Sequence, residues 1–340
     1  MFRSLLFVCS AWVLMAASCG KGNTPPPAGP PTNLALVATV STDNSGTVQF
    51  KATATNAVSF DFDLGNGVFR TVADGNLTYR YTASGTYDVN VIAKSAGGQT
   101  ASLRKTITVA VARSLVWSDE FDSPGAPDPA KWGYDIGAGG WGNAELQYYT
   151  NRLENASISN GTLKITAIRE NFSGSPFTSA RLLSRNKFSF KYGRVDVRAK
   201  LPVGAGTWPA IWMLGNNIGA VGWPACGEID IMEHRGNDPN RIHGTVHYTG
   251  NSGGGGIGGT VLSSNVSTVF RVYSIEWTDQ FIKFMIDDAV YFTFPNAATL
   301  PFNQSFFLLL NVAMGGNFGG AVDPAFSSSI MEVDYVRVYN

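Results

Sequence analysis

Apolar and polar residues alternate with a period of two in short stretches along most of this chain. In the first third, such stretches cover residues 34–40, 47–53, 59–64, 86–93 and 106–111, with turn signals such as Gly65-Asn66-Gly67 between them. A period of two is typical of half-buried β-strands, and this spacing of short strands is typical of a sandwich. Residues 33–112 are therefore predicted to form a small β-sandwich.

The remainder, residues 114–340, shows the same alternation over 162–168, 188–201, 270–277, 281–286, 289–294 and 331–339. The buried parity changes across Gly193, which predicts a bulge or bend in a long strand. Six glycines between Gly253 and Gly259 predict a flexible loop. No long stretch has a helical period. The fold class is therefore all-β, and this region is predicted to form two stacked antiparallel sheets of jelly-roll type.

The amino terminus has the layout of an export signal. Arg3 precedes an apolar stretch, residues 5–17, that is too short to span a bilayer, and small residues follow it. Ala16-Ala17-Ser18 directly before Cys19 resembles a bacterial lipoprotein signal over residues 1–19, which implies that Cys19 is lipidated. The alternative is a simple secretion signal. We expect a protein on the bacterial cell surface or outer membrane, or else a secreted one.

Residues 20–32 are rich in proline and glycine, which predicts a linker without a core. Membrane contact is expected only through lipid on Cys19. With Cys9 removed with the signal and Cys19 carrying lipid, only Cys226 remains, and it is expected to be a free, buried thiol.

Charge excludes one class of partner. The chain of 340 residues has 25 Lys+Arg and 25 Asp+Glu, so its formal net charge is zero. Nucleic-acid binding requires a surplus of positive charge, so no such partner is expected. Charged residues are 15% of the chain, whereas 21 Phe, 12 Tyr and 8 Trp supply many aromatic rings. This composition suits an uncharged ligand held on aromatic side chains. We also expect the protein to be a monomer.

The stretch from Glu228 to Glu233, Glu-Ile-Asp-Ile-Met-Glu, carries the candidate chemistry. On a strand, Glu228 and Asp230 share one face while the isoleucines point to the other. Strict alternation would bury Glu233, which is costly for an unpaired carboxylate. We therefore predict a bulge near Met232 that returns Glu233 to the open face, so that three carboxylates line a concave surface.

Crowded carboxylates suit glycoside hydrolysis. A retaining glycosidase uses one ionised carboxylate as nucleophile and one protonated carboxyl as acid, and a third carboxylate helps to keep them in different protonation states. A calcium cluster and a solvated charged face are the alternatives. The apolar residues at the alternate positions argue against a solvated face.

These residues resemble the signature of glycoside hydrolase family 16, in its laminarinase branch. Further motifs of that branch occur in family order across residues 114–340, among them Trp117-Ser118-Asp119-Glu120-Phe121, Trp208-Pro209-Ala210-Ile211-Trp212, and Gly244-Thr245-Val246-His247-Tyr248. The resemblance implies a jelly-roll sandwich with a concave substrate cleft. It implies a retaining endo-β-1,3-glucanase that acts on β-glucan and needs no cofactor for its chemistry. Glu228 then matches the nucleophile, Asp230 the assisting carboxylate and Glu233 the acid/base.

The same resemblance implies further contacts with the sugar. Candidate aromatic platforms and polar contacts are Trp223, Trp208, Trp212, Trp141, Asn143, Arg181 and His247. Each has a structural alternative: a core position for tryptophan, a carboxylate clamp for Arg181, a hydrogen-bonded structural role for His247. Glu120 and Asp334 match a calcium site away from the cleft, so the resemblance also implies a structural calcium ion. His234 stands where the branch usually has tyrosine. This departure puts the family's contacts in that part of the cleft in doubt, but not the chemistry.

The first region also resembles a family. Phe60-Asp61-Phe62-Asp63-Leu64-Gly65, together with Tyr79-Arg80-Tyr81, is similar to domains of the polycystic-kidney-disease (PKD) type over residues 33–112. The resemblance implies an immunoglobulin-like sandwich that acts as a spacer or a weak glycan-contacting module. We favour the spacer, since no catalytic constellation occurs in this region.

Two other functions remain open. The same mechanism could act on mixed-linkage β-1,3-1,4-glucan or an algal galactan, although a sulfated galactan would call for extra Arg or Lys. A non-catalytic surface glycan-binding lipoprotein is the second alternative. The complete set Glu228, Asp230 and Glu233 argues against it, because a pure binder has no use for paired carboxylates.

Overall fold

The computed structural model describes residues 29–340. The chain divides into two units, the first ending at Ala112 and the second beginning at Arg113. The expected signal 1–19 with Cys19, and residues 20–28 of the expected linker, lie outside the described residues. Within residues 29–340, the helices are all too short or too polar to cross a membrane.

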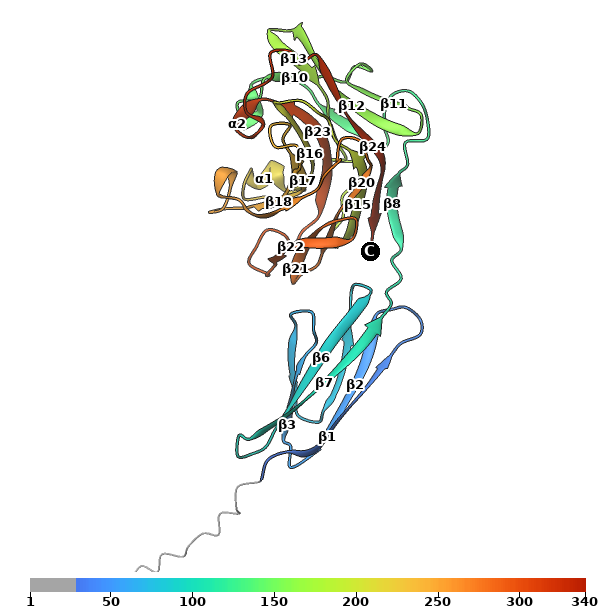
Figure 1. The fold of residues 1–340 in the computed structure, drawn as a ribbon, viewed down its shortest axis with the longest axis vertical. Coiled ribbons are helices and arrows are strands. Elements are labelled where there is room, and N and C mark those ends of the chain that lie inside the picture. The colour runs from blue at the N-terminus through green and yellow to red at the C-terminus, as the bar shows by residue number, and fades with distance from the viewer. Residues whose placement is uncertain (1–28) are drawn as a thin grey trace, which may run out of the picture. The chain divides into compact units, whose positions relative to one another are not determined.

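The first unit is a sandwich of two antiparallel sheets (Figure 1). One sheet has the order β1-β2-β5 and the other β4-β3-β6-β7. Apolar side chains from both sheets fill the space between them, and the hydroxyl of buried Tyr81 donates to the carbonyl of Leu64 at 2.9 Å. The strands are β1 (Thr32–Val40), β2 (Thr47–Thr55), β3 (Ser59–Asp63), β4 (Phe69–Val72), β5 (Asn76–Arg80), β6 (Gly85–Lys94) and β7 (Thr100–Val109).

Three details of this unit differ from the sequence prediction. Strands β4 and β5 were not expected, and β7 begins at Thr100 rather than at residue 106. In β4 and in the first seven residues of β7, no side chain is buried. Such strands carry no apolar alternation, so they escape a search for a period of two.

The second unit also consists of two stacked sheets, which confirms the predicted all-β sandwich. The seven-stranded sheet has the order β19-β18-β17-β16-β23-β14-β9. Its strands are β9 (Gly133–Asp135), β14 (Arg181–Leu183), β16 (Thr207–Gly215), β17 (Glu228–His234), β18 (Arg241–His247), β19 (Ile257–Leu262) and β23 (Phe306–Met314).

The ten-stranded sheet has the main path β10-β13-β12-β24-β15-β20-β21-β22, with β11 paired to β12 and β8 paired to β24. Its strands are β8 (Leu115–Asp119), β10 (Gln147–Tyr149), β11 (Ala156–Ser159), β12 (Thr162–Phe172), β13 (Ser175–Ser179), β15 (Gly193–Lys200), β20 (Arg271–Trp277), β21 (Phe281–Ile286), β22 (Ala289–Pro295) and β24 (Ser328–Tyr339). Two short helices, α1 (Ile218–Val221) and α2 (Gly316–Gly319), lie in connections.

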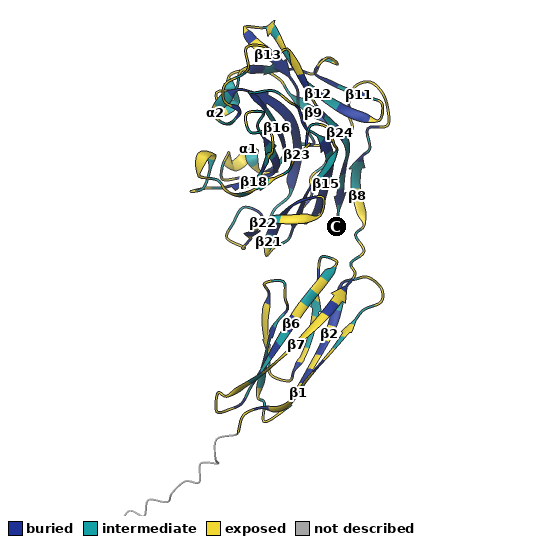
Figure 2. Cartoon of the chain, viewed as in Figure 1, coloured by how far each residue is buried: buried dark blue, intermediate teal, exposed yellow. Residues whose placement is uncertain are grey.

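Strand β23 is the most deeply buried element, as Figure 2 shows, because both of its faces are covered. Phe306, Leu308 and Leu310 belong to the main core between the sheets. Phe307 and Leu309 join a smaller cluster with Cys226 on the opposite face. Cys226 is free and buried as predicted, and burial raises the pKa of its thiol to about 11. A protonated thiol is a poor nucleophile, so this cysteine is part of the packing.

The parity change at Gly193 has a different cause from the predicted bulge. β15 begins at Gly193, and Phe190 before it forms an isolated bridge with Phe306. Gly193 has φ 113°, and a Cβ there would overlap the carbonyl oxygen of Tyr339. The glycine therefore marks the start of a strand. The predicted glycine loop is also shorter than expected, because Gly258 and Gly259 lie within β19.

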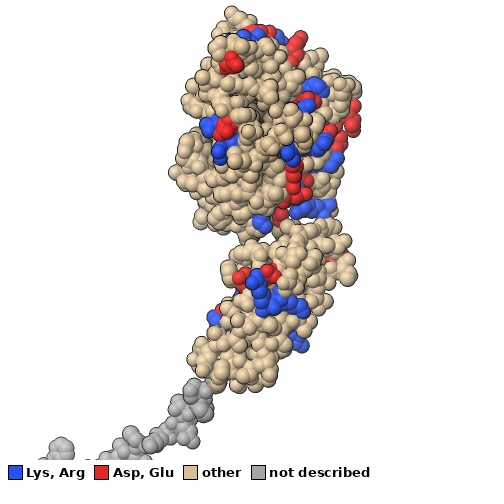
Figure 3. Space-filling view, viewed as in Figure 1, with Lys and Arg blue, Asp and Glu red and all other residues tan. Residues whose placement is uncertain are grey.

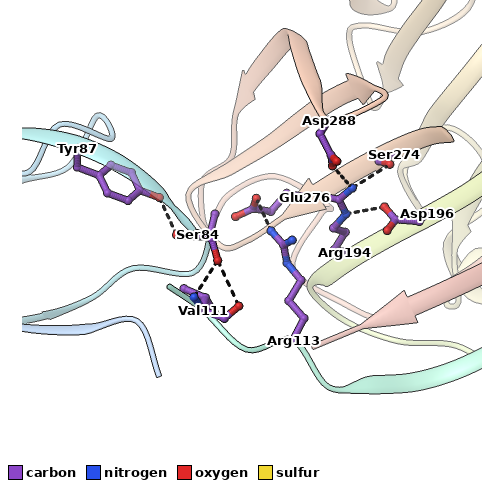
Figure 4. Close-up of polar contacts among 10 residues, drawn as sticks. Ser84, Tyr87, Val111, Arg113, Arg194, Asp196, Ser274, Glu276 and Asp288 are labelled. Carbon is purple, nitrogen blue, oxygen red and sulfur yellow. Dashed lines mark hydrogen bonds and ion pairs between the residues drawn. The ribbon is translucent and has the colours of Figure 1, made fainter. Parts of the chain in front are cut away.

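Polar side chains pair within each unit (Figure 4). In the first, Ser84 Oγ accepts from the backbone N–H of Val111 at 2.8 Å. In the second, Arg194 of β15 pairs with Asp196 and Asp288, and Arg113 pairs with Glu276 of β20. Arg194 is only 9% exposed, and its guanidinium needs such partners because an unpaired buried charge is costly.

The separate cores predict separate unfolding. Tyr81→Phe removes a buried hydrogen bond and leaves the Leu64 carbonyl without that partner, so it should lower the free energy of unfolding of the first unit by ~1–2 kcal/mol. Calorimetry should show the transition of the second unit unchanged. Tyr79→Phe is the matched control, because the hydroxyl of Tyr79 is only part-buried and accepts from Asn66. Equal shifts of both transitions would contradict independent cores.

Candidate active site

Strand β17 carries the three carboxylates on one face through a bulge. Along β16, Ile211 pairs with Met232 and the following residue, Trp212, pairs with Asp230. Ile231 of β17 therefore has no partner of its own, and β17 holds one extra residue. Ile231 and Met232 are both buried, at 1% and 0% exposure. Glu228, Asp230 and Glu233 consequently all border the same cleft. The bulge predicted from the cost of burying Glu233 is confirmed.

The cleft has a volume of about 610 Å³ and crosses the exposed face of the seven-stranded sheet. Every residue that the sequence analysis assigned to sugar contact borders it. These residues come from the β9–β10 connection (Trp141, Asn143), β14 (Arg181), β16 (Trp208, Trp212), the α1–β17 connection (Trp223) and β18 (His247). Side chains far apart in the sequence therefore converge on one surface with the carboxylates.

Two tryptophans hold the outer carboxylates by hydrogen bonds. Trp223 Nε1 donates to Glu228 Oε2 at 2.7 Å, and Trp208 Nε1 donates to Glu233 Oε1 at 2.9 Å. A hydrogen bond to a carboxylate fixes its orientation and favours its charged form. Trp223 is 48% exposed, so one face of its ring remains free to stack on a sugar.

His247 lies beside the inner pair of carboxylates. Its Nε2 is 3.1 Å from Asp230 Oδ2 and 3.9 Å from Glu228 Oε1. Asp230 is 3% exposed, so its charge interacts in a region with little water to screen it. A protonated His247 would offset part of the repulsion between Asp230 and Glu228.

Burial dominates the acidity of the cluster. It raises the pKa of Glu228 to about 8, with the charge of Asp230 adding to the effect and His247 and Trp223 opposing it. Burial also raises the pKa of Glu233 to about 7, against the hydrogen bond from Trp208. The pKa of Asp230 is raised as well, by burial and then by the charge of Glu233. The three groups therefore share at least one proton near neutral pH, as a nucleophile and acid pair requires.

One side of the cleft, here called the far wall, includes Trp141 and Trp212. Sequence reasoning missed a hydrogen-bonded chain behind this far wall. Trp212 Nε1 donates to Asn311 Oδ1 at 2.7 Å, and Asn311 Nδ2 donates to the Tyr149 hydroxyl at 3.0 Å. That hydroxyl in turn donates to Glu145 Oε2 at 3.1 Å. Asn311 and Glu145 both line the cleft. The polar residue within the apolar run of β23 was an available signal for Asn311.

Arg181 and Asn143 also build this wall. Arg181 Nε is 3.0 Å from Asp135 Oδ2, and its guanidinium lies 4.6 Å from the ring of Trp212 and 5.0 Å from that of Trp141. Asn143 Nδ2 donates to Glu145 Oε1 at 3.2 Å. The clamp considered for Arg181 is present, and it orients two aromatic rings toward the cleft.

Glu120 and Asp334 do not fit the expected calcium site. Arg337 donates to both oxygens of Glu120, at 3.0 and 2.8 Å, and Arg198 pairs with Asp334. A calcium ion needs several free oxygen ligands, whereas here each carboxylate already carries a guanidinium. The described His, Cys, Asp and Glu side chains that lie close enough to share a metal ion are Glu228, Asp230 and His247, in the cleft itself.

His234 does not alter the cleft. The bulge turns its side chain to the opposite side of β17 from Glu233, where it is 1% exposed and its Nε2 lies 3.1 Å from the carbonyl oxygen of Pro239. Burial lowers the pKa of this imidazole. The departure from the common tyrosine therefore changes contacts in the interior and leaves the carboxylate face as it is.

Known proteins share both units. Residues 23–111 match the PKD domain. A β-glucanase of Rhodothermus marinus is 49% identical over 241 residues, which are 66% of this chain and 84% of that protein. The X-ray structure of the laminarinase from Rhodothermus marinus superposes with a TM-score of 0.64 at 50% identity, covering 67% of this chain and 98% of that one.

A second solved structure has broader specificity. SCLam, described as a non-specific endo-β-1,3(4)-glucanase, is 41% identical with a TM-score of 0.65, over 67% of this chain and 91% of that one. Residues 143–337 match glycosyl hydrolases family 16, a stretch that contains β17 and nearly all of the cleft. With the bulged carboxylate strand and its tryptophan walls in place, this chain belongs to glycosyl hydrolases family 16 and is a glycosidase that carries a PKD domain ahead of its catalytic unit.

Proposed function

We propose that this protein cleaves β-1,3-glucan chains internally, with retention of anomeric configuration. The observation that carries the proposal is the bulge of β17, which brings Glu228, Asp230 and Glu233 to one cleft bordered by tryptophans. Family 16 chemistry needs no cofactor, so side chains of this chain perform each step. The β-glucanase and laminarinase relatives support the choice of substrate.

In the first step, ionised Glu228 attacks the anomeric carbon of the sugar. Glu233, held by Trp208, gives its proton to the departing glycosidic oxygen, so no alkoxide is expelled. The product is a glycosyl ester on Glu228 and a shortened chain with a free hydroxyl group.

In the second step, Glu233 is a carboxylate and acts as a base. It takes a proton from water, the water oxygen attacks the anomeric carbon, and the ester bond to Glu228 breaks. Two inversions give net retention. Asp230 and His247 lie against Glu228 and hold its carboxyl group in position for the attack.

The substrate class follows from the charge and the walls of the cleft. Figure 3 shows charged side chains scattered over a mostly uncharged surface. The ionisable residues that line the cleft are the three carboxyl groups, Glu145, Arg181 and His247, and Arg181 is neutralised by Asp135. Such a cleft suits a neutral glucan held on indole faces and offers little to a sulfated galactan.

Mixed-linkage glucan is the second candidate substrate. The similarity to SCLam, which acts on both linkage types by its description, favours this alternative specifically. A purely glycan-binding role is disfavoured, because a binding surface would gain nothing from burying three carboxylates that repel one another.

A product profile tests the substrate. The protein should release a series of oligosaccharides from laminarin from the earliest times, less product from lichenan, and none from agarose or carrageenan. Glu228→Gln removes the nucleophile and keeps the shape, so it should abolish hydrolysis without lowering the unfolding temperature. Normal turnover by Glu228→Gln would remove the assignment; a lichenan rate above that on laminarin would select the second candidate.

The pH dependence tests the roles of the carboxylates. Because Glu233 must be protonated while Glu228 is ionised, kcat/KM should fall on the alkaline side once both carboxyl groups have lost their protons, above their raised pKa values of about 7 and about 8. Since Glu228 must be ionised and its pKa is raised to about 8, the acidic limb should also lie well above the ordinary carboxyl range. The observed limbs belong to the coupled pair.

Glu233→Gln should lower kcat/KM by ~10²–10⁴ and remove the alkaline limb. An activated aryl glycoside, whose leaving group needs no proton, should be much less affected. An optimum in the range of unperturbed carboxyl groups, or an alkaline limb that survives in this variant, would contradict the assignment.

We infer that the catalytic unit works on the cell surface, attached through lipid on Cys19 and extended from it by the linker 20–32 and the PKD domain. The small residues before Cys19 and the proline-rich sequence after it support this inference. The spacer role of the PKD domain rests on its scattered acidic residues and the absence of Trp, Cys and His from residues 33–112.

The lipid anchor has a direct test. Expressed in a bacterium fed a labelled fatty acid, the wild type should carry label and sediment with membranes. Cys19→Ser should lose both properties and keep its activity on soluble oligosaccharides, because the catalytic unit is a separate fold. Cys9→Ser is the matched control within the signal. Label on Cys19→Ser would mean that lipid is attached elsewhere, and a wild type that carries no label would leave secretion as the remaining alternative.

A further inference from the structure

We propose that Gly256 is a positioning residue for catalysis: because it has no Cβ, the backbone of the loop after β18 packs against the imidazole of His247 and holds it beside Asp230 and Glu228. This proposal rests on the proposed function and deepens it. It explains why a glycine-rich loop borders the cleft.

The requirement for glycine at this position is one of space. A Cβ on Gly256 would overlap His247 Cε1, and it would lie 2.6 Å from His247 Nδ1 and 2.8 Å from Thr245 Cγ2. The backbone of Gly256 has φ −57° and ψ 148°, which any residue adopts. An alanine there would be conformationally allowed but would push the imidazole aside.

The neighbouring glycines show that the tight contact is local. A Cβ on Gly253, Gly254 or Gly255 would meet nothing within 4 Å. Gly253 has a positive φ, whereas the φ of Gly255 is not positive. Gly255 belongs to the same 3₁₀ turn as Gly253 and directly precedes Gly256. Gly254 borders the cleft and Gly255 is not among its lining residues. Gly255 is therefore a matched control for a change of glycine to alanine.

Packing is what holds the ring of His247. Its Nδ1 is buried and has no hydrogen-bond partner among the described residues. Its Nε2 faces Asp230 Oδ2 at 3.1 Å, and the ring of Trp223 lies at 6.3 Å, tilted by 49°. Without a hydrogen bond to Nδ1, the ring depends on the loop backbone at Gly256 to keep it against the carboxylates.

The position of this ring matters because of the charges that face it. On β17 these groups are Glu228, Asp230 and Glu233. Glu145 and Arg181 also line the cleft. The loop residues 248–256 include no charged side chain. The charge of His247 lowers the pKa of both Glu228 and Glu233. Moving the ring away would raise both pKa values and leave less Glu228 ionised.

A test without substrate measures the ring itself. The chain has three histidines, so the ring signals can be assigned by NMR with single substitutions. Gly256→Ala should shift the His247 Cε1–H resonance and leave those of His234 and His243 in place. Gly255→Ala should leave all three unchanged. This readout stands even if the glucan assignment fails. An unmoved His247 signal in Gly256→Ala would mean that the loop, and not the ring, yields to the added methyl group.

A kinetic cycle then connects the ring to catalysis. Gly256→Ala should lower kcat/KM near neutral pH on the order of tenfold and move the acidic limb to higher pH by roughly one unit, the size of effect expected from losing a nearby opposite charge. His247→Ala should move the limb in the same direction. Gly255→Ala should follow the wild-type profile.

The double variant decides between positioning and general damage. If Gly256 acts through His247, adding Gly256→Ala to His247→Ala should cause much less further loss than Gly256→Ala causes alone, because the ring that the methyl group displaces is gone and only the contact with Thr245 Cγ2 remains. Multiplying losses, or an unshifted limb in Gly256→Ala, would overturn the proposal. Unchanged unfolding temperatures of the single variants exclude misfolding as the cause.

Discussion

Mutual repulsion of three carboxylates in a poorly hydrated cleft is the constraint on which this active site depends. Glu228, Asp230 and Glu233 would each favour water, yet a bulge in β17 turns all three to the same side. Their pKa values rise as a result, chiefly through burial. The fold holds them there because the residues between them, Ile229, Ile231 and Met232, are anchored in the core. Apolar burial on one face of the strand thus maintains an unfavourable charge arrangement on the other, which is a common cost of catalytic sites.

The partners of the carboxylates explain how one cluster supports different protonation states. Each of the outer glutamates accepts a hydrogen bond from a different tryptophan, whereas Asp230 faces an imidazole. The tryptophans therefore have two functions. Their N–H groups orient the reacting carboxylates, and their ring faces form the walls that a neutral sugar can stack on. Behind the far wall, the chain from Trp212 through Asn311 and Tyr149 to Glu145 ties the position of one ring to a buried polar network.

The two units differ in a way that matches their proposed roles. The first unit has a small core and polar, exposed strands such as β4, with no cluster of reactive side chains among its described residues. The second unit has a large core that surrounds a fully buried central strand, β23. Strand β23 pairs with β16, and β16 pairs with β17; the register of these two pairings determines which side chains meet across the cleft.

The sequence by itself determined the fold class, part of the strands, the neutral charge and the three carboxylates that border the cleft. It did so because alternation within one strand fixes which side chains share a face, as for Glu228 and Asp230, and because the cost of burying Glu233 demanded a bulge. Only the tertiary structure decided which distant groups meet: Trp208 with Glu233, Arg337 with Glu120, and the backbone of Gly256 with His247. Such contacts depend on strand register and on the path of loops, which arise from packing across the whole domain and leave no periodic trace in the chain.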